Sequence, residues 1–170
     1  SDIKLDYNDV LIRPKRSTLG SRKAVSLERR YNFRNFQPNL QYYIDECHYA
    51  GIPIMASNMD GVGTFEMADA LAKQGMFTCL AKSYTVDELV DYFDKQKYSI
   101  LRSDHVAVSM GILPPDFDKL KEVMEKTENK IKYVCVDVAN GYSERFVDFI
   151  RFLREQFAEM EFNSIINDQA

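Results

Sequence analysis

Polar and apolar residues alternate in blocks along residues 52–157, and these blocks predict four strand-then-helix units. Short runs of β-branched and apolar residues begin near positions 52, 76, 106 and 131 and are typical of strands buried on both faces. The segment after each run carries apolar residues at helical spacing, as expected for a helix with one buried face. Such a βα repeat predicts right-handed crossovers and a parallel sheet, either doubly wound or closed into a βα barrel.

Capping residues mark the starts of the predicted helices. Thr85 and Glu88 form a capping box, and Ser143 stands before an apolar helical pattern, as an N-cap residue does. The pair Pro114 and Pro115 is typical of the first turn of a helix. We therefore expect helices over about 64–74, 85–95 and 143–157, and a helix that opens at Pro114 and carries Met124, after an irregular opening segment.

Composition narrows the class of protein. With 170 residues, of which 45% are hydrophobic and 28% charged, the chain is long enough for a globular core. The formal net charge of -4 argues against a surface for nucleic acid or an anionic membrane. Because no apolar run approaches about 18 residues and the chain starts with polar residues, we expect a cytoplasmic protein. The three cysteines are too widely spaced to indicate a disulfide framework or a zinc site, and no other pattern suggests a metal.

Polar residues follow each predicted strand, and the run 137–144 is the most informative of these corners. Ligands of α/β proteins bind beyond the carboxyl ends of parallel strands, so a site is expected there. Lys82 ends an apolar strand and could reach a ligand or a carboxylate, or could simply extend its ammonium into solvent. Asp60 and Asp137 could orient a substrate, relay a proton or balance Lys82; alternatively they cap the adjacent helices.

Basic residues gather in the opening segment. Arg13, Lys15, Arg16 and Arg22 could bind the phosphates of a nucleotide, since guanidinium groups match phosphate geometry. The alternative is a solvated basic arm. The glycines of residues 61–63 do not complete a phosphate-binding pattern, so they add little to either interpretation.

Four segments, taken in chain order, resemble the GMP reductases, which are related to IMP dehydrogenase. They are 9–19, which contains Arg-Pro-Lys-Arg-Ser, then 21–22, 58–68, and 137–144, which reads Asp-Val-Ala-Asn-Gly-Tyr-Ser-Glu. The resemblance implies a (β/α)8 TIM barrel, with residues 1–51 as an N-terminal arm and lead-in and 52–170 as the first half of the barrel, about four βα units. It also implies NADPH-dependent reductive deamination of GMP to IMP and ammonia by a homotetramer.

The resemblance also assigns roles to residues of this chain. Lys82 and Asp137 match catalytic positions, and both also lie beside the nicotinamide of the cofactor. Four further residues are expected to bind the cofactor: Ser21 and Arg22 from an adjacent subunit, and Val138 and Ala139 at the corner. Ser57 and Met59 are expected to bind the nucleotide.

Several features depart from the family pattern. Ala81 and Ser83 flank the strand-end lysine where the family usually has histidines, and Gly61 replaces a usual threonine. None of the three cysteines matches the nucleophile of the family, and residues 161–167 lack the expected fifth-strand pattern. A complete barrel takes about 250 residues, so we expect a fragment of a longer chain. Two alternatives remain: an IMP dehydrogenase, and a non-catalytic half-barrel that binds a nucleotide or a partner chain.

Overall fold

The protein is built around a parallel β-sheet. The computed structural model describes residues 3–31, 49–94, 99–128, 130–158 and 165–166. Five strands pair in chain order, each parallel to the next. They are β3 (Met55–Ala56), β4 (Phe77–Cys79), β5 (Val106–Met110), β6 (Tyr133–Val136) and β7 (Ile165–Ile166). The predicted α/β fold with a parallel sheet is therefore confirmed, and β7 adds a strand at a place where the sequence pattern indicated none.

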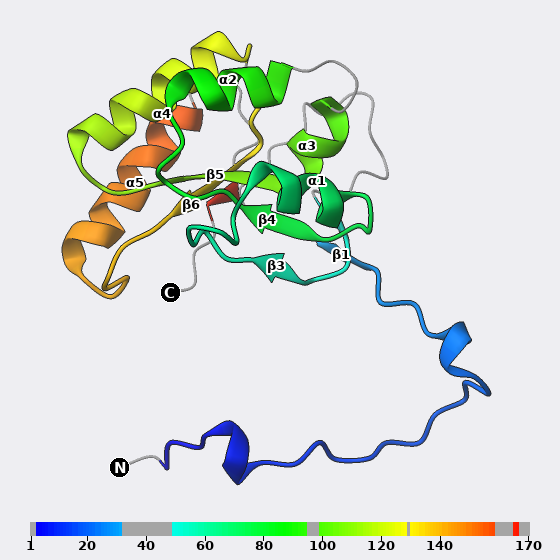
Figure 1. Ribbon diagram of the computed structural model, residues 1–170. Helices are drawn as coiled ribbons and strands as arrows, with labels where there is room; N and C mark the ends of the chain where they lie inside the picture. The colour runs from blue at the N-terminus through cyan, green and yellow to red at the C-terminus, as the bar shows by residue number, and fades with distance from the viewer. Residues whose placement is uncertain (1–2, 32–48, 95–98, 129, 159–164, 167–170) are drawn as a thin grey trace.

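Helices connect the strands and cover one face of the sheet (Figure 1). They are α1 (Phe65–Ala72), α2 (Val86–Asp94), α3 (Ser99–His105), α4 (Pro114–Lys126) and α5 (Glu144–Ala158). In the described part of the chain, none of them is both long and apolar enough to cross a membrane.

The predicted helix starts are confirmed by their hydrogen bonds. Thr85 Oγ1 accepts from the backbone N–H of Glu88 at 3.3 Å, and Glu88 Oε2 accepts from that of Thr85 at 2.7 Å, which completes the capping box. Ser143 Oγ accepts from the N–H of Phe146 at 3.2 Å. The expected end of the second helix, at residue 95, lies outside the described residues.

The starts of two strands and one whole helix differ most from the prediction. β3 begins at Met55 rather than at 52, because Pro53 has no N–H and the N–H of Ile54 donates to Ile52 O at 2.8 Å instead of to a strand. β6 begins at Tyr133 rather than at 131. Helix α3 was not predicted at all.

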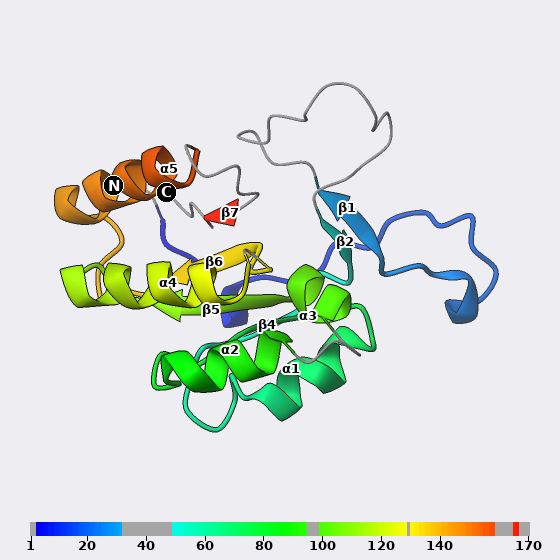
Figure 2. The ribbon, with the colours of Figure 1, turned by 90° about the horizontal axis from the view of Figure 1, so that it is seen from above.

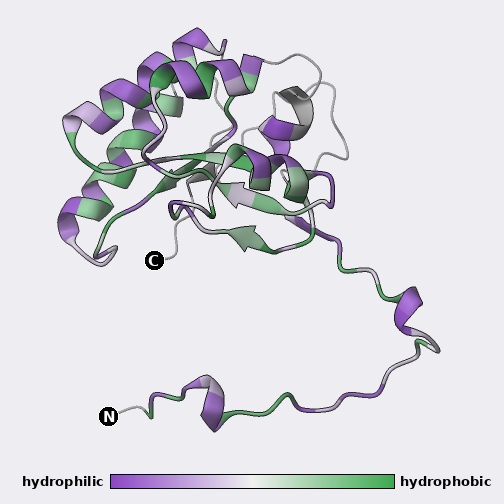
Figure 3. Ribbon diagram, viewed as in Figure 1, coloured by the Kyte–Doolittle hydropathy of each residue, from purple (hydrophilic) through white to green (hydrophobic). Residues whose placement is uncertain are grey.

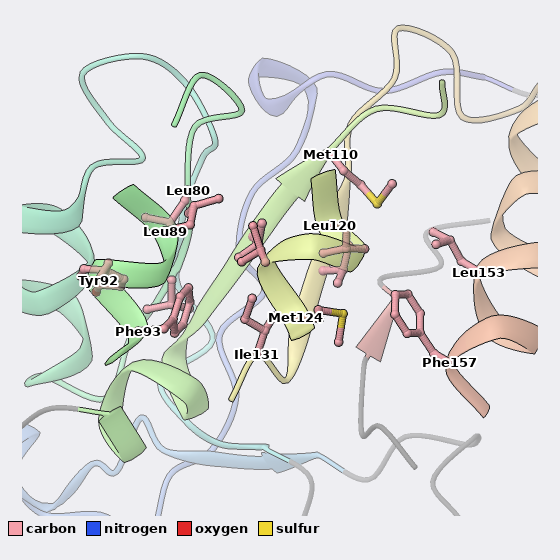
Figure 4. Packing of buried hydrophobic residues seen from close by; sticks show 14 of the residues in the cluster. Leu80, Leu89, Tyr92, Phe93, Met110, Leu120, Met124, Ile131, Leu153 and Phe157 are labelled. Carbon is pink, nitrogen blue, oxygen red and sulfur yellow. The ribbon is translucent and has the colours of Figure 1, made fainter. Parts of the chain in front are cut away.

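The main hydrophobic core lies between the sheet and its helices. Figure 4 shows how side chains from α2, α4 and α5 meet Leu80, which follows β4, and Met110 of β5. The fully buried members of this core include Leu80, Phe93, Leu120, Met124, Ile131 and Leu153. In Figure 3 the helices alternate between hydrophilic and hydrophobic residues, as expected when one side faces this core and the other faces solvent.

A smaller cluster covers the opposite face of the sheet. Phe77, Cys79, Ala107 and Tyr133 form it, and Tyr49 packs against it. Tyr49 belongs to an antiparallel pair, β1 (Arg29–Tyr31) with β2 (Tyr49–Gly51). Its ring meets the Phe77 ring edge-on, with centroids 5.7 Å apart. The pair β1–β2 therefore packs near the amino ends of the strands and leaves the carboxyl ends open.

Residues 3–31 form an exposed arm that extends away from the sheet (Figures 1 and 2). The arm is less irregular than expected, because it contains two short 3-10 helices, η1 (Tyr7–Asp9) and η2 (Arg22–Ala24), as well as β1. Large apolar side chains on it are almost fully exposed, among them Tyr7, Leu11 and Ile12 at 93%, 97% and 96%.

Candidate active site

An ion pair joins the ends of two strands at the carboxyl edge of the sheet. Lys82 follows β4 and Asp137 follows β6, and Lys82 Nζ lies 3.1 Å from Asp137 Oδ2. Both side chains are partly open to solvent, with exposed fractions of 47% and 40%. The structure therefore brings together the two residues that the sequence placed at the rim, in the arrangement in which Asp137 balances the charge of Lys82.

The ion pair stands in the wall of an open pocket of about 590 Å³. One side of this pocket is the corner after β5, residues 111–113, and the other is the corner after β6, where Val138 and Ala139 line it next to Asp137. A volume of this size falls in the range of small-molecule sites. Two of the residues expected to bind cofactor therefore share a cavity with the two expected to be catalytic.

Asp137 is held by the sheet itself. Its N–H donates to Met110 O at 2.8 Å, so the β5–β6 ladder extends one residue past β6. The following turn is closed by Asn140 Oδ1, which accepts from the N–H of Tyr142 at 3.0 Å, before Ser143 caps α5. The side chains of Asn140 and Ser143 thus serve turn geometry, while the carboxylate of Asp137 lines the pocket.

Two of the departures from the family pattern, Ser83 and Gly61, have specific local geometry. Ser83 Oγ donates to Asp60 Oδ1 at 3.1 Å, which ties the corner after β4 to the corner after β3. Asp60 therefore neither caps a helix nor pairs with Lys82. Gly61 has a φ of +78°, a backbone conformation that a threonine would adopt only with strain.

Two thiols lie below the ion pair on the same face of the sheet. Cys79 is buried, as expected for a core residue, whereas Cys135 is only partly buried. The neighbouring side chains of Cys79 and Ser109 outweigh burial and lower the pKa of Cys135 to about 7. The same thiol–thiol contact and burial raise the pKa of Cys79. Cys135 is thus the more easily ionised thiol of the two.

The structure does not bring every expected residue to the pocket. Ser57 and Met59 follow β3 at the same edge of the sheet, but in the described part of the chain neither lines this cavity. Ser21 and Arg22 lie on the exposed arm, where Ser21 Oγ accepts from the N–H of Lys23 at 3.3 Å and caps η2. Within one chain the arm is separate from the ion pair (Figure 1).

Two charged residues of the pocket were missed from the sequence. Asp116 and Arg145 both line it. Asp116 Oδ2 accepts from the N–H of Leu113 at 3.0 Å, and a Cβ on Gly111 would lie 2.5 Å from the same oxygen. Asp116 and Arg145 each stand in the first turn of a helix, where their sequence pattern is that of solvent-exposed positions, so only the fold places them beside Lys82.

A parallel βα sheet with a charged pair and an open pocket at the carboxyl ends of its strands is the arrangement of part of a (β/α)8 barrel, a fold in which ligands bind at that edge. Residues 4–166 match the family model described as IMP dehydrogenase / GMP reductase domain. The chain therefore belongs to the IMP dehydrogenase / GMP reductase family.

Comparison with known proteins places the chain near the reductases of this family. It is 49% identical to the GMP reductase of Ascaris suum over 154 residues and 42% identical to the human GMP reductase 2 over 159 residues. These matches cover 91% and 94% of the chain, but the chain spans only about two fifths of either relative. The solved structure of inosine 5'-monophosphate dehydrogenase from Legionella pneumophila superposes with a TM-score of 0.68 at 19% identity, over 96% of this chain and 43% of that one, and shares its fold.

Proposed function

We propose that the protein takes part in the NADPH-dependent reductive deamination of GMP to IMP and ammonia. The observation that carries this proposal is the identity of 42–49% to proteins named GMP reductase, over nine tenths of the chain. In the overall reaction, GMP, NADPH and two protons give IMP, NADP⁺ and an ammonium ion. The C2–N bond of the purine breaks, a C2–H bond forms, and NADPH supplies the two electrons as a hydride.

Lys82 and Asp137 are proposed to manage the proton that the departing ammonia needs. An ammonium group at the pocket wall can donate a proton, and a carboxylate 3.1 Å away keeps the side chain charged and oriented. Because both groups are partly exposed, Lys82 can recover its proton from solvent after each turnover. Asp137 acts through Lys82, and its anchorage to β5 fixes the direction from which the proton arrives.

The pocket residues fit a nicotinamide cofactor in size and chemistry. Val138 and Ala139 offer an apolar wall next to the charged pair, which suits a flat ring that must transfer hydride away from water. Arg22 has an exposed guanidinium that suits the additional phosphate of NADPH. Since the arm stands apart from the pocket in one chain, we propose that Ser21 and Arg22 serve the site of an adjacent subunit.

We also propose a homotetramer that works in the cytoplasm. The arm of residues 3–31 exposes apolar side chains that a neighbouring subunit would cover. Cys79 and Cys135 are free thiols, which suits a reducing compartment. We keep the division of the chain into an arm and lead-in, residues 1–51, and a barrel part, residues 52–170. Mass measurement in solution tests the assembly. Removal of residues 3–28 is expected to leave an assembly of fewer subunits.

The test of the reaction uses the complete gene product. GMP should cause the oxidation of NADPH, with IMP and ammonia formed in equal amounts. Reduction of NAD in the presence of IMP, without turnover of GMP, would instead identify an IMP dehydrogenase. If neither reaction occurs and the 170-residue chain unfolds cooperatively by itself, the non-catalytic half-barrel is the better account.

A further inference from the structure

A lysine of α4 contacts the backbone of the segment that carries Lys82. Lys119 Nζ donates to the carbonyl oxygen of Lys82 at 3.0 Å and also to that of Tyr84. One ammonium group therefore closes the corner between β4 and α2 from below. Lys119 is 37 residues from Lys82 in the sequence, so only the packing of α4 against the corner creates this contact.

The surroundings of Lys119 keep its ammonium at this place. The next residue, Leu120, is fully buried in the main core and fixes this turn of α4. A small cavity of about 20 Å³ lies between Lys119, Lys82 and the end of β5. Glu88 also lies near: hydrogen bonds from Thr85 lower the pKa of its carboxyl, and the charge of Lys119 adds to this effect. A lysine bound to two carbonyl groups and near a carboxylate has less freedom than a surface lysine.

We propose that Lys119 is a positioning residue that clamps the β4–α2 corner and thereby holds Lys82 toward Asp137 and the pocket. The inference rests on the proposed function for its effect on turnover, but the clamp itself is a property of the fold. Ser83, whose hydroxyl donates to Asp60, adds a second hydrogen bond to the same corner. The carbonyl of Lys82 and the side chain of the next residue, Ser83, are thus both hydrogen-bonded to other segments of the chain.

The clamp predicts a specific kinetic result. In the complete gene product, Lys119→Met removes both donors without adding a charge. Because small displacements of a catalytic group cost much of its effect, kcat should fall about tenfold while the KM for GMP stays within about twofold. Lys119→Arg restores donors to both carbonyl groups and should recover kcat to within about threefold of the wild type. Lys121→Met is the matched control, since Lys121 is an exposed lysine of α4 that pairs with Glu125.

A second readout does not depend on turnover. Limited reductive methylation followed by peptide mass spectrometry reports how available the amine of Lys82 is. Lys119→Met should raise the labelling rate of Lys82 about two- to fivefold, because the pair with Asp137 forms less often. Lys119→Arg and Lys121→Met should leave that rate near the wild-type value. Thermal unfolding of each variant identifies any loss due to misfolding, and the Arg variant decides the question if the Met variant is unstable.

The outcomes separate the clamp from the function. An unchanged labelling rate of Lys82 in Lys119→Met, with kcat within twofold of the wild type, overturns the clamp. An equal loss of kcat in Lys119→Met and Lys119→Arg also overturns the clamp, since Lys119 would then act only through packing. A wild-type protein that does not turn over GMP contradicts the proposed function, while a raised labelling rate in Lys119→Met still supports the clamp.

Discussion

The two faces of the parallel sheet differ in what they contain. Among the described residues, the face toward the helices carries a continuous core of 17 buried residues, from Ala68 to Phe157. The opposite face carries a cluster of four, and two of the strands on that side continue into Lys82 and Asp137. Because side chains alternate along a strand, each short strand contributes residues to both faces.

This difference suggests a division of labour. Val108 and Val134 point into the helix side, while Ser109 and Cys135, one residue further on, belong to the face of the ion pair. Stability should therefore depend mostly on the first set and turnover mostly on the second. The following predictions test that separation, from the largest expected effect on the free energy of unfolding to the smallest.

Phe93→Ala should have the largest effect. Phe93 is completely buried in the helix-side core, and deletion of a buried phenyl ring costs about 3–5 kcal/mol of unfolding free energy. Chemical denaturation of the complete gene product measures the loss. Phe152→Ala is the control, since Phe152 is 39% exposed and should lose far less. If both variants lose equally little, the helix side does not carry the stability. The specific activity of folded Phe93→Ala protein should stay near that of the wild type.

Arg102→Met should come next, with a loss of about 2 kcal/mol, because it strands a partly buried carboxylate. Arg102 is buried, and its Nε and Nη2 donate to the two carboxylate oxygens of Asp69 at 2.9 and 2.8 Å. The Arg102 guanidinium also lies 4.1 Å from the centre of the Tyr92 ring, so the residue joins α1, α2 and α3. A loss as small as that of an exposed ion pair would contradict this role.

The same pair predicts a pH dependence. Burial raises the pKa of Asp69, but hydrogen bonds from Arg102 and Tyr92 outweigh burial and hold it below its ordinary value. A lowered pKa contributes stability that is present above the ordinary carboxyl pKa of about 3.9 and is lost as the pH falls through the folded value. Denaturation curves between about pH 5 and pH 2 should show this loss in the wild type and a smaller one in Arg102→Met. Parallel curves for the two proteins would contradict it.

Ser143→Ala should cost about 1 kcal/mol, because it removes the N-cap of α5. Ser143→Asp keeps an acceptor at the cap and should lose less. Ser143 also lines the pocket. The Ser143→Ala variant therefore tests whether the corner after β6 depends on a fixed start of α5. A Ser143→Ala variant with unchanged stability would show that the rest of α5 positions the corner alone.

Much of this structure could be predicted from the sequence, at positions where a residue type has a single common structural role. The capping box of Thr85 and Glu88 and the cap at Ser143 mark helix starts because side-chain oxygens there satisfy free N–H groups. Lys82 and Asp137 were expected at the rim because each follows an apolar strand, and the parallel sheet brings the ends of alternate strands together.

The features that were missed depend on packing between distant segments. Helix α3 carries Arg102 and Ser103, both polar and both buried, so its pattern does not resemble an amphipathic helix. Lys119 has the sequence context of any lysine on a surface helix, and nothing local indicates its bonds to the corner after β4. Such contacts appear only when the helices are placed on the sheet.

One comparison of two numbers for Lys82→Met tests the separation of the faces most directly: the free energy of unfolding and the turnover of GMP with NADPH, both in the complete gene product. We predict a change in stability below about 1 kcal/mol, since the pair with Asp137 is partly exposed. We predict at the same time that kcat falls at least about a hundredfold, because a proton donor is lost. Unchanged kinetics, or a loss of activity fully explained by unfolding, would contradict the account.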